Sequence, residues 1–399
     1  MRKVKKATLV LSLLVVGIAS SLQAQEISNN KFGKGIKVIA KDSSFYMKAS
    51  MRFQTLYNGE MNLETDEWND NVMIRRARLK FDGFVYNPKV AYKVELAISN
   101  RDNGKVAPEN NLAASIVLDA VLKYKFAPGW QLWFGQTKLP GNRERVISSQ
   151  ALQFVDRSEL NSKYTIDRGT GVQLRHKHNV GDMVIKEMGS ISMGEGKNYT
   201  ASNVGGYEVT ARVELLPFGE FASKGDYFGS DLKREETPKL AIGLTYDQNN
   251  NTNRVAGFKG DFLAEQRDQK TIFIDAMFKS DGFSAMLEYA DKTTDESAIV
   301  SDGVYQTGTG LNLQAGYLFT NNFEVAGRYT SIKPEDNNWS DDYVDYTLGF
   351  SRYIVGHNLK IQSDLSYEDH DLSDFIFPGE TAPRYNDTFK VRFQVELAF

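Results

Sequence analysis

Six basic residues gather in one long polar segment near the middle of the chain. Lys138, Arg143, Arg145, Arg157, Lys163 and Arg168 lie there beside the carboxylates Glu144, Asp156, Glu159 and Asp167. An arginine guanidinium presents paired donors that match phosphate and carboxylate oxygens, and Lys and Arg side chains that line a pore favour anions. The segment is therefore a candidate anion path or constriction.

The four histidines offer little catalytic or metal-binding chemistry by their spacing. His176 and His178 lie two positions apart without a neighbouring carboxylate or third ligand, and His357 and His370 stand alone. A Ser-His hydrolase would need a partner arrangement that the sequence does not show. The chain has no Cys, which excludes a disulfide framework and a thiolate metal site. We therefore predict no enzyme activity, no catalytic residue, no cofactor and no metal.

The elements that would position these charges are strands, and the end of the chain shows the pattern most clearly. Residues 387–399 alternate without a break: Phe389, Val391, Phe393, Val395, Leu397 and Phe399 point one way, and polar side chains point the other way. A period of two separates the two faces of a sheet. A strand of about ten residues with an aromatic terminus is typical of a bilayer-spanning barrel wall. A soluble sandwich is the alternative, but we would expect shorter strands there.

The first residues have the layout of a secretory signal. Arg2, Lys3, Lys5 and Lys6 precede the apolar run 9–18, and small residues lead to Ala24. We predict a signal peptide over 1–24 and a periplasmic segment over 25–44. Removing the signal would leave 44 Lys plus Arg against 51 Asp plus Glu. Because the chain is mildly acidic, we predict that it does not bind nucleic acid.

The composition is compatible with a membrane protein that crosses the bilayer with strands rather than helices. After residue 24 no continuous apolar run reaches the roughly 18 residues of a spanning helix. Mean hydropathy is −0.42. A barrel with a wet interior needs only every second wall residue to be apolar, so its average hydropathy looks soluble. If the chain crosses a membrane, it must do so as a closed barrel.

Sixteen segments fit this alternation, so we predict an all-β, antiparallel transmembrane barrel over residues 45–399. The pattern over 183–193 is the least regular of them. The predicted strands are 45–57, 72–86, 90–99, 113–126, 130–137, 170–178, 183–193, 207–216, 239–247, 271–279, 283–290, 310–319, 323–331, 343–353, 358–367 and 387–399.

The connections between these strands alternate between short and long. Six tight turns rich in Gly, Pro, Asn and Asp fall on even-numbered connections, and odd-numbered connections are long and polar. Short periplasmic turns and long outer loops indicate an outer-membrane barrel. The connection 217–238 breaks the rule, because it is long where a periplasmic turn is expected. It is either a structured plug or flap, or a sign that the strand count is wrong there.

Strand parity also predicts which charges face the interior. Strands one to six turn inward a set of cations that we name the basic wall: Lys48, Arg52, Arg76, Arg78, Lys80, Lys93, Lys123, Lys125, Arg175 and Lys177. Only Asp82, Glu95 and Asp119 oppose them there. Strands eight to sixteen turn both signs inward, including Arg212, Lys279, Lys360, Glu214, Asp275, Glu288, Glu324, Asp364 and Glu396, and we name this the mixed wall. Interior charges are also often solvated ion pairs of little energetic value, about 0–1 kcal/mol each.

Several short motifs, in order and spacing, resemble the phosphate-selective porin O and P family in its Bacteroidetes-type branch. They are the lead-in 31–35 (KFGKG), 51–54 (MRFQ), 74–79 (IRRARL), 134–140 (FGQTKLP) and 148–158 (SSQALQFVDRS). The resemblance implies a sixteen-stranded barrel, usually a homotrimer, whose long third loop folds into the lumen. The stretch 161–169 (NSKYTIDRG) departs from the arginine- and aspartate-bearing segment of the family.

Together these observations predict a porin of the cell outer membrane of a Gram-negative bacterium. It would let small hydrophilic solutes diffuse passively, with a preference for anions such as phosphate. Its other partners would be outer-membrane lipid and lipopolysaccharide. A general or weakly selective porin is the first alternative, and a closed binding or adhesion barrel is the second.

Overall fold

The computed structural model describes residues 25–28, 31–103, 116–199, 206–335, 341–372 and 385–399. The predicted signal peptide and the first three residues of the predicted strand 113–126 lie outside the described residues.

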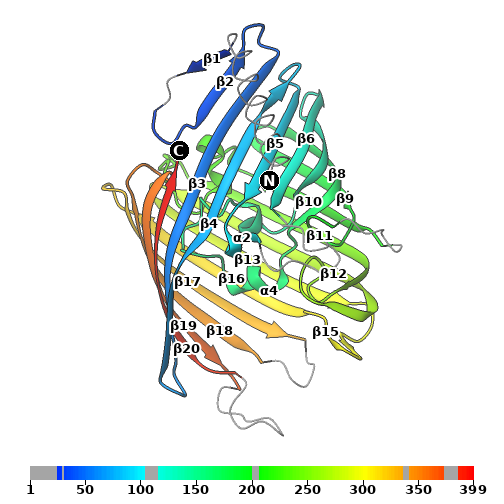
Figure 1. Cartoon of the computed structure of the whole chain (residues 1–399), viewed down its shortest axis with the longest axis vertical. Helices are drawn as coiled ribbons and strands as arrows, with labels where there is room; N and C mark the ends of the chain where they lie inside the picture. Colours follow the sequence, from blue (N-terminus) through cyan, green and yellow to red (C-terminus); the bar gives the residue numbers. More distant parts are fainter. Residues whose placement is uncertain (1–24, 29–30, 104–115, 200–205, 336–340, 373–384) are drawn as a thin grey trace, which may run out of the picture.

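A closed antiparallel barrel of sixteen strands forms the body of the molecule (Figure 1). Its strands are β3 (Phe45–Asn62), β4 (Glu67–Val85), β5 (Val90–Ala97), β6 (Val117–Ala127), β7 (Trp130–Lys138), β8 (Arg168–Val180), β9 (Met183–Ser192), β10 (Glu208–Leu216), β11 (Lys239–Arg254), β12 (Phe262–Ser280), β13 (Phe283–Thr294), β16 (Gly308–Leu318), β17 (Phe323–Pro334), β18 (Tyr343–Tyr353), β19 (Leu359–His370) and β20 (Thr388–Ala398). The predicted fold is confirmed, including the weakly patterned strand β9.

The barrel closes where its last strand pairs with its first. Phe393 of β20 lies opposite Tyr57 of β3, and at the end of the ladder Met51 and Phe399 exchange backbone hydrogen bonds of 2.8 and 2.9 Å. The alternating terminal segment is therefore a wall strand, as predicted. Closure leaves the wall without an unpaired edge, which lipid would not tolerate.

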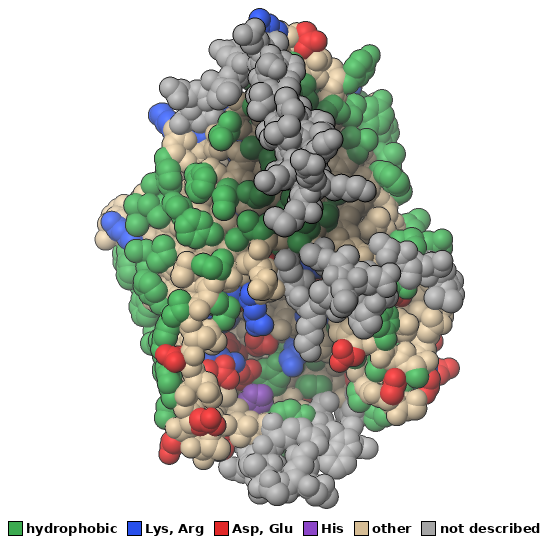
Figure 2. Space-filling view, in the orientation of Figure 1, with side chains coloured by type: hydrophobic (Ala, Val, Ile, Leu, Met, Phe, Trp, Pro, Cys, Tyr) green, Lys and Arg blue, Asp and Glu red, His purple; other side chains and the backbone are tan. Residues whose placement is uncertain are grey.

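The two faces of the wall differ in the way the alternation predicts. In β10, Glu208, Arg212 and Glu214 are buried, while Val209 and Val213 between them are exposed. Hydrophobic side chains also gather over the outer surface in Figure 2. Polar residues inside and apolar residues outside are the arrangement of a barrel that spans a lipid bilayer.

Two hairpins extend well beyond their predicted ends. Strands β3 and β4 pair as far as Asn62 and Glu67, and β11 and β12 pair as far as Arg254 and Phe262. Much of the predicted connections 58–71 and 248–270 is therefore strand. The prediction stopped where apolar alternation stopped, but backbone pairing continues past the bilayer because it satisfies the N–H and C=O groups of polar residues as well.

A β-bulge changes the parity of β4. Gln54 lies opposite Arg76, whereas the next residue, Thr55, lies opposite Ile74, so Arg75 is an extra residue without a partner. Arg75 and Arg76 both reach the carboxylate of Asp156. The bulge thus turns two consecutive arginines to the same side, where simple alternation predicted only Arg76.

Smaller elements lie at the ends of the barrel. At the end where β3 begins, β2 (Ile36–Ala40) pairs with β3 and β1 (Gln25–Ser28) pairs with β2. The outer connections carry α2 (Asn100–Asn103) and the hairpin of β14 (Ile299–Val300) and β15 (Gly303–Val304). No helix in the described part of the chain is long and apolar enough to cross a membrane.

The long connection between β10 and β11 is structured, and the strand count around it is right. It contains the 3₁₀ helix η2 (Ala222–Tyr227), and the flanking strands pair directly with each other. We name residues 217–238 the periplasmic connection. Of the two readings that the sequence left open, the structured segment is the correct one.

Candidate functional site

Residues 139–167, which we name the third-loop segment, join β7 to β8 and carry the helices α3 (Arg143–Val146) and α4 (Glu159–Tyr164). Around α3 the segment is fixed to the mixed wall. Arg143 Nε donates to Asp275 over 2.6 Å, and Asn142 Nδ2 donates to Glu288 over 2.7 Å. The backbone N–H of Glu144 donates to the same Glu288 carboxylate over 2.9 Å. These carboxylates lie on β12 and β13.

The later part of the segment continues along the same wall. Gln153 Nε2 donates to Glu324 of β17 over 2.8 Å, and the N–H of Val155 donates to Asp364 of β19 over 3.1 Å. Helix α4 packs against β13, β16 and β17, with Leu160 fully buried. The segment therefore covers inward-facing side chains from β12 round to β19.

One edge of the third-loop segment reaches the basic wall. Arg52 donates to the hydroxyl of Ser149 over 2.7 Å, and Arg75 and Arg76 each donate to Asp156 over 2.8 Å. Burial opposes the charge of Asp156, but Arg76 and Arg75 outweigh it and hold the pKa of this carboxyl well below its ordinary value. Asp156 therefore binds both arginines as a carboxylate.

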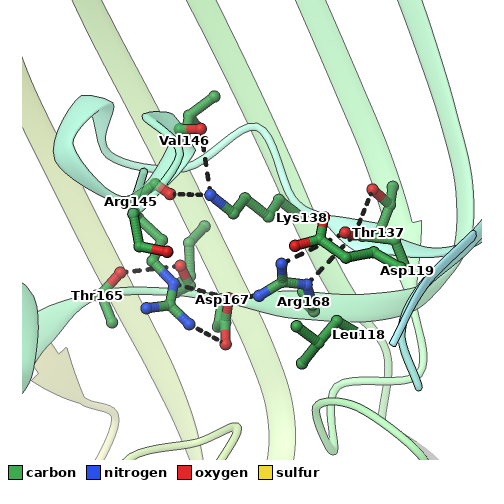
Figure 3. Close-up of polar contacts among 12 residues, drawn as sticks. Leu118, Asp119, Thr137, Lys138, Arg145, Val146, Thr165, Asp167 and Arg168 are labelled. Atoms are coloured by element: carbon green, nitrogen blue, oxygen red, sulfur yellow. Dashed lines mark hydrogen bonds and ion pairs between the residues drawn. The ribbon is translucent and has the colours of Figure 1, made fainter. Parts of the chain in front are cut away.

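The two ends of the segment meet in a charged cluster, which Figure 3 shows. Lys138 Nζ donates to the carbonyl oxygen of Arg145 over 2.6 Å, and Arg145 Nε donates to Asp167 over 2.7 Å. Arg168 Nε lies 3.2 Å from Asp119. Although burial opposes the charge of Asp167, Arg145 and Arg168 lower the pKa of this carboxyl. The cluster closes the neck of the segment with a chain of ion pairs.

The other two cations of the predicted anion path are placed differently. Arg157 donates to the carbonyl oxygens of Glu144 and Ile147 over 2.9 and 2.7 Å. Lys163 Nζ lies 5.6 Å from the centroid of the Tyr343 ring. Four of the six predicted residues thus lie in the third-loop segment, while Lys138 ends β7 and Arg168 begins β8. Their environments also differ, because Arg143, Arg145 and Arg168 pair with carboxylates whereas Lys138 and Arg157 bind carbonyl oxygens.

The periplasmic connection packs on the third-loop segment. Phe221 is buried in an apolar cluster with Ile147 and Leu152 of that segment and Met277 of β12. Lys279 Nζ donates to two carbonyl oxygens of the connection over 2.9 and 2.7 Å. The connection and the third-loop segment therefore form one packed unit against the mixed wall.

Exposure to water differs between the two walls. On the mixed wall, Glu214, Asp275, Glu288 and Glu324 are at most 1 % exposed. On the basic wall, the side chains of Lys80 and Lys177 are 40 % and 47 % exposed. The charges of one wall are covered by protein, and part of the other wall stays in contact with solvent.

Two further cations of the basic wall contact the same aromatic ring. Lys123 Nζ lies 3.7 Å from the centroid of the Trp133 indole, and the Arg175 guanidinium carbon lies 4.1 Å from it. Arg175 donates to the side-chain oxygen of Gln173. Within the described ranges, Lys123, Lys125 and Arg175 form no ion pair. Cation–π contacts hold such cations in place without neutralising their charge.

Six other predicted members of the basic wall have carboxylate partners, namely Arg52, Arg76, Arg78, Lys80, Lys93 and Lys177. Arg52, Arg76 and Arg78 are mostly buried, and Lys80 and Lys177 are more exposed. Their partners are Glu396 for Arg52, Asp156 for Arg76, Glu95 and Asp102 for Arg78, Asp82 for Lys80 and Glu220 for Lys177. Sequence parity placed these charges in the interior but did not identify their partners, which come from other strands, from the loops and, for Lys80, from the same strand.

The two neighbouring histidines have a partner that the sequence did not reveal. Glu187 of β9 lies opposite His176 of β8, and its Oε2 is 2.6 Å from His176 Nδ1 and 3.6 Å from His178 Nδ1. The expectation that no carboxylate lies near this pair is therefore wrong. Strand register brings it there across eleven residues of sequence.

A closed wall of sixteen tilted strands, apolar outside and polar inside, with short turns at one end, defines a barrel of the outer-membrane porin class. The family described as phosphate-selective porin O and P matches residues 47–374, and the chain belongs to this family. Membership agrees with the resemblance of the sequence motifs.

Similar proteins agree on the architecture. An uncharacterized protein of Aquifex aeolicus (strain VF5) is 24% identical over 376 residues, which cover 86% of this chain and 87% of that protein. The outer membrane channel DcaP of Acinetobacter baumannii shares 13% identity with a TM-score of 0.54, over 90% of this chain and 99% of DcaP. A trimer form of OmpT from Vibrio cholerae shares 11% identity with a TM-score of 0.50, over 88% and 99%.

The protein is thus a porin of the outer membrane, a channel for passive diffusion rather than an enzyme.

Proposed function

We propose that this channel prefers small anions such as phosphate. Solutes would pass along the basic wall, and the third-loop segment, held against the mixed wall, would narrow the lumen and set the size limit. The observation that carries the proposal is the unequal exposure of the two walls.

The charges of the basic wall that are left without an ion pair among the described residues are positive. The carboxylates Glu95 and Asp119 of the basic wall are buried and bind Lys93, Arg78 and Arg168, while Lys123, Lys125 and Arg175 form no ion pair with the described residues. Screening is limited over short distances, since the Debye length is about 8 Å at physiological salt. A narrow path beside these side chains would therefore concentrate anions.

The position of the three cations suggests where selection occurs. Lys123 and Lys125 precede the turn at 128–129, and Arg175 precedes the turn at 181–182. Both turns belong to the periplasmic set. We infer a basic vestibule at the periplasmic end of the lumen, with the charged neck of the third-loop segment on its outer side.

The third-loop cations would contribute unequally. Arg143 is fully buried between Asp275 and Glu214, so its charge mainly attaches the segment to the wall. Lys138 and Arg157 bind only carbonyl oxygens among the hydrogen bonds seen. Their charge is not cancelled by a carboxylate, and we propose that they supply the positive potential of the constriction.

Reversal potential in a salt gradient across a planar bilayer tests the anion preference. The wild-type channel should select chloride over potassium, and phosphate should block the chloride current. Replacing Lys123, Lys125 and Arg175 together by Gln should bring the reversal potential markedly closer to zero. The outward-facing set Lys270, Lys333 and Arg352, replaced in the same way, is the matched control and should change nothing.

A second variant locates the filter. Replacing Lys138 and Arg157 by Gln should reduce anion preference if the constriction contributes, and unchanged selectivity would assign the filter to the vestibule alone. A cation-selective wild type would reject the proposal. A reversal potential near zero would indicate a general porin instead.

A closed barrel is the second candidate function, because an apolar cluster joins the third-loop segment to the periplasmic connection inside the wall. A binding or adhesion barrel of this kind would give no conductance at any voltage. Lipid and lipopolysaccharide contacts stay predictions, as does the homotrimer, which the mass of the detergent-solubilised protein would test.

A further inference from the structure

Three side chains that bind metals in other proteins meet on the outer face of the barrel. His176 and His178 project from β8, and Glu187 projects from the neighbouring strand β9. Their donor atoms all lie within 4.8 Å of one another. Nothing in the proposed transport path uses these residues, because they alternate with the inward-facing Arg175 and Lys177 of the same strand.

The histidine rings are held in place from one side. The indole of Trp130 stacks on His176 with ring centroids 4.1 Å apart, and His176 stacks on His178 at 4.8 Å. His178 Nδ1 is buried and has no hydrogen-bond partner. Ring stacking alone does not explain this nitrogen, which is buried without a partner and lies 3.6 Å from the Glu187 carboxylate.

We propose that His176, His178 and Glu187 bind one divalent transition-metal ion of the zinc type. Two imidazoles and one carboxylate are a common ligand set for Zn²⁺, and a water completes the four positions. Cu²⁺ and Ni²⁺ suit the same donors, and Cu²⁺ binds nitrogen ligands more tightly. The shared donors do not suit Mg²⁺ or Ca²⁺, which take oxygen ligands.

The donor atoms, which lie within 4.8 Å of one another, must draw closer together to bind one ion. Ligands about 2.0–2.1 Å from a tetrahedral ion lie roughly 3.3 Å apart, whereas Glu187 Oε2 now lies 2.6 Å from His176 Nδ1 and 3.6 Å from His178 Nδ1. Glu187 has a side chain 47 % exposed, so it can rotate to this separation and leave a position open to water. The ion would replace the hydrogen bond between Glu187 and His176.

The competing explanation is an interfacial aromatic belt. Tyr124, Phe126 and Trp130 form a row of ring contacts that continues into the two histidines. Such a row suits a periplasmic membrane boundary. An aromatic belt explains why the rings lie in a row, but it does not explain why three metal-binding donor atoms meet there. The two explanations can therefore be distinguished by whether the protein binds a metal ion.

A bound ion would tie β8 to β9 near their periplasmic turn. The site lies outside the lumen, so this inference does not depend on the anion preference. Channel selectivity should be the same with and without the ion, whereas resistance of the folded barrel to heat should rise when Zn²⁺ is present, because a ligand that binds only the folded state stabilises it.

Titration of the tag-free protein with ZnCl₂ in detergent, followed by calorimetry, tests the site. We expect one ion per chain, and the double variant His176→Gln/His178→Gln should weaken binding by at least about tenfold. His370→Gln is the matched control, since His370 binds Asp341 in an outer loop and should leave the titration unchanged.

A second measurement guards against a variant that folds poorly. Cu²⁺ bound beside Trp130 should quench its fluorescence, and Glu187→Gln should reduce the quenching while leaving both histidines and the aromatic row intact. No zinc uptake by the wild type, or equal uptake by the double variant, would overturn the proposal and leave the aromatic belt as the explanation.

Discussion

The two inner walls of this barrel have similar strands but opposite relations to water. The basic wall, on β3 to β8, keeps several cations solvated, while the mixed wall, on β10 to β20, lies under the third-loop segment and the periplasmic connection. Glu288 on the mixed wall is fully buried, whereas Lys80 on the basic wall is 40 % exposed in its side chain. Only exposed charges can act on a passing solute.

The difference between the two walls shows that charged side chains have two roles here: they attach a loop where they are buried in ion pairs, and they face the solute path where they are not. Arg143 and Asp275 form a fully buried pair that attaches a loop, whereas Lys123 and Arg175 lie beside an indole and form no ion pair with the described residues. Removing one partner of a buried pair leaves an uncompensated charge and costs about 3–5 kcal/mol. Changes on the mixed wall should therefore affect structure first, and changes on the basic wall should affect selectivity first.

The largest effect should come from detaching the third-loop segment. In the variant Asp275→Ala/Glu288→Ala, Arg143 loses its closest carboxylate, and Asn142 and the Glu144 N–H lose their acceptor. We expect the segment to leave the wall and single-channel conductance to rise severalfold, which planar-bilayer recording would measure.

The matched control for this variant is Asp82→Ala on the basic wall, whose carboxylate binds only the exposed Lys80 among its ion pairs. It should leave conductance nearly unchanged. If the double variant folds and conducts like the wild type, then the contacts to β12 and β13 do not hold the segment in the lumen.

A smaller effect should follow from weakening the contact between the two covering segments. Phe221 is 3 % exposed and packs with Ile147 and Leu152. Phe221→Ala removes a buried aromatic ring and should cost about 3–5 kcal/mol of local stability. Limited proteolysis should then cut the periplasmic connection faster. The exposed Phe218→Ala is the control, and equal cleavage of both variants would argue against the packed unit.

The fold could be predicted from the sequence because lipid imposes a simple rule on every wall strand. Each outward position must be apolar, so the alternation in 387–399 or 239–247 identifies both the strand and its faces. Turn residues then gave the order of short and long connections. The hairpin ends were missed since pairing outside the bilayer, as at Asn62 and Glu67, obeys no apolar alternation.

The candidate site could be predicted only in part, because it depends on contacts between residues far apart in sequence. The sequence around Arg143 does not indicate that its ion-pair partner is Asp275, which lies 132 positions later. Strand parity also cannot predict the extra residue Arg75 at the bulge. Nor can it predict the strand register that places Glu187 opposite His176. The doubled arginine in 74–79 was the one available signal for the bulge.

The smallest effect, and the sharpest test of the comparison, concerns two aspartates of similar chemistry. Asp82 forms a half-buried 2.9 Å pair with Lys80 on the basic wall, and Asp364 of the mixed wall is buried, with Arg392 at 2.6 Å. Asp82→Asn should raise anion preference slightly and change stability by about 0–1 kcal/mol. High salt should abolish the gain, because the Debye length falls to about 3 Å at 1 M.

Asp364→Asn should do the reverse. It removes a carboxylate that also accepts from the N–H of Val155, so we expect a clear loss of stability in denaturant with little change in reversal potential. Both variants lose one negative charge, and the two sites differ in how far water reaches the carboxylate and in how many donors bind it. If Asp364→Asn shifts selectivity as much as Asp82→Asn does, then exposure does not decide which wall charges act on the solute.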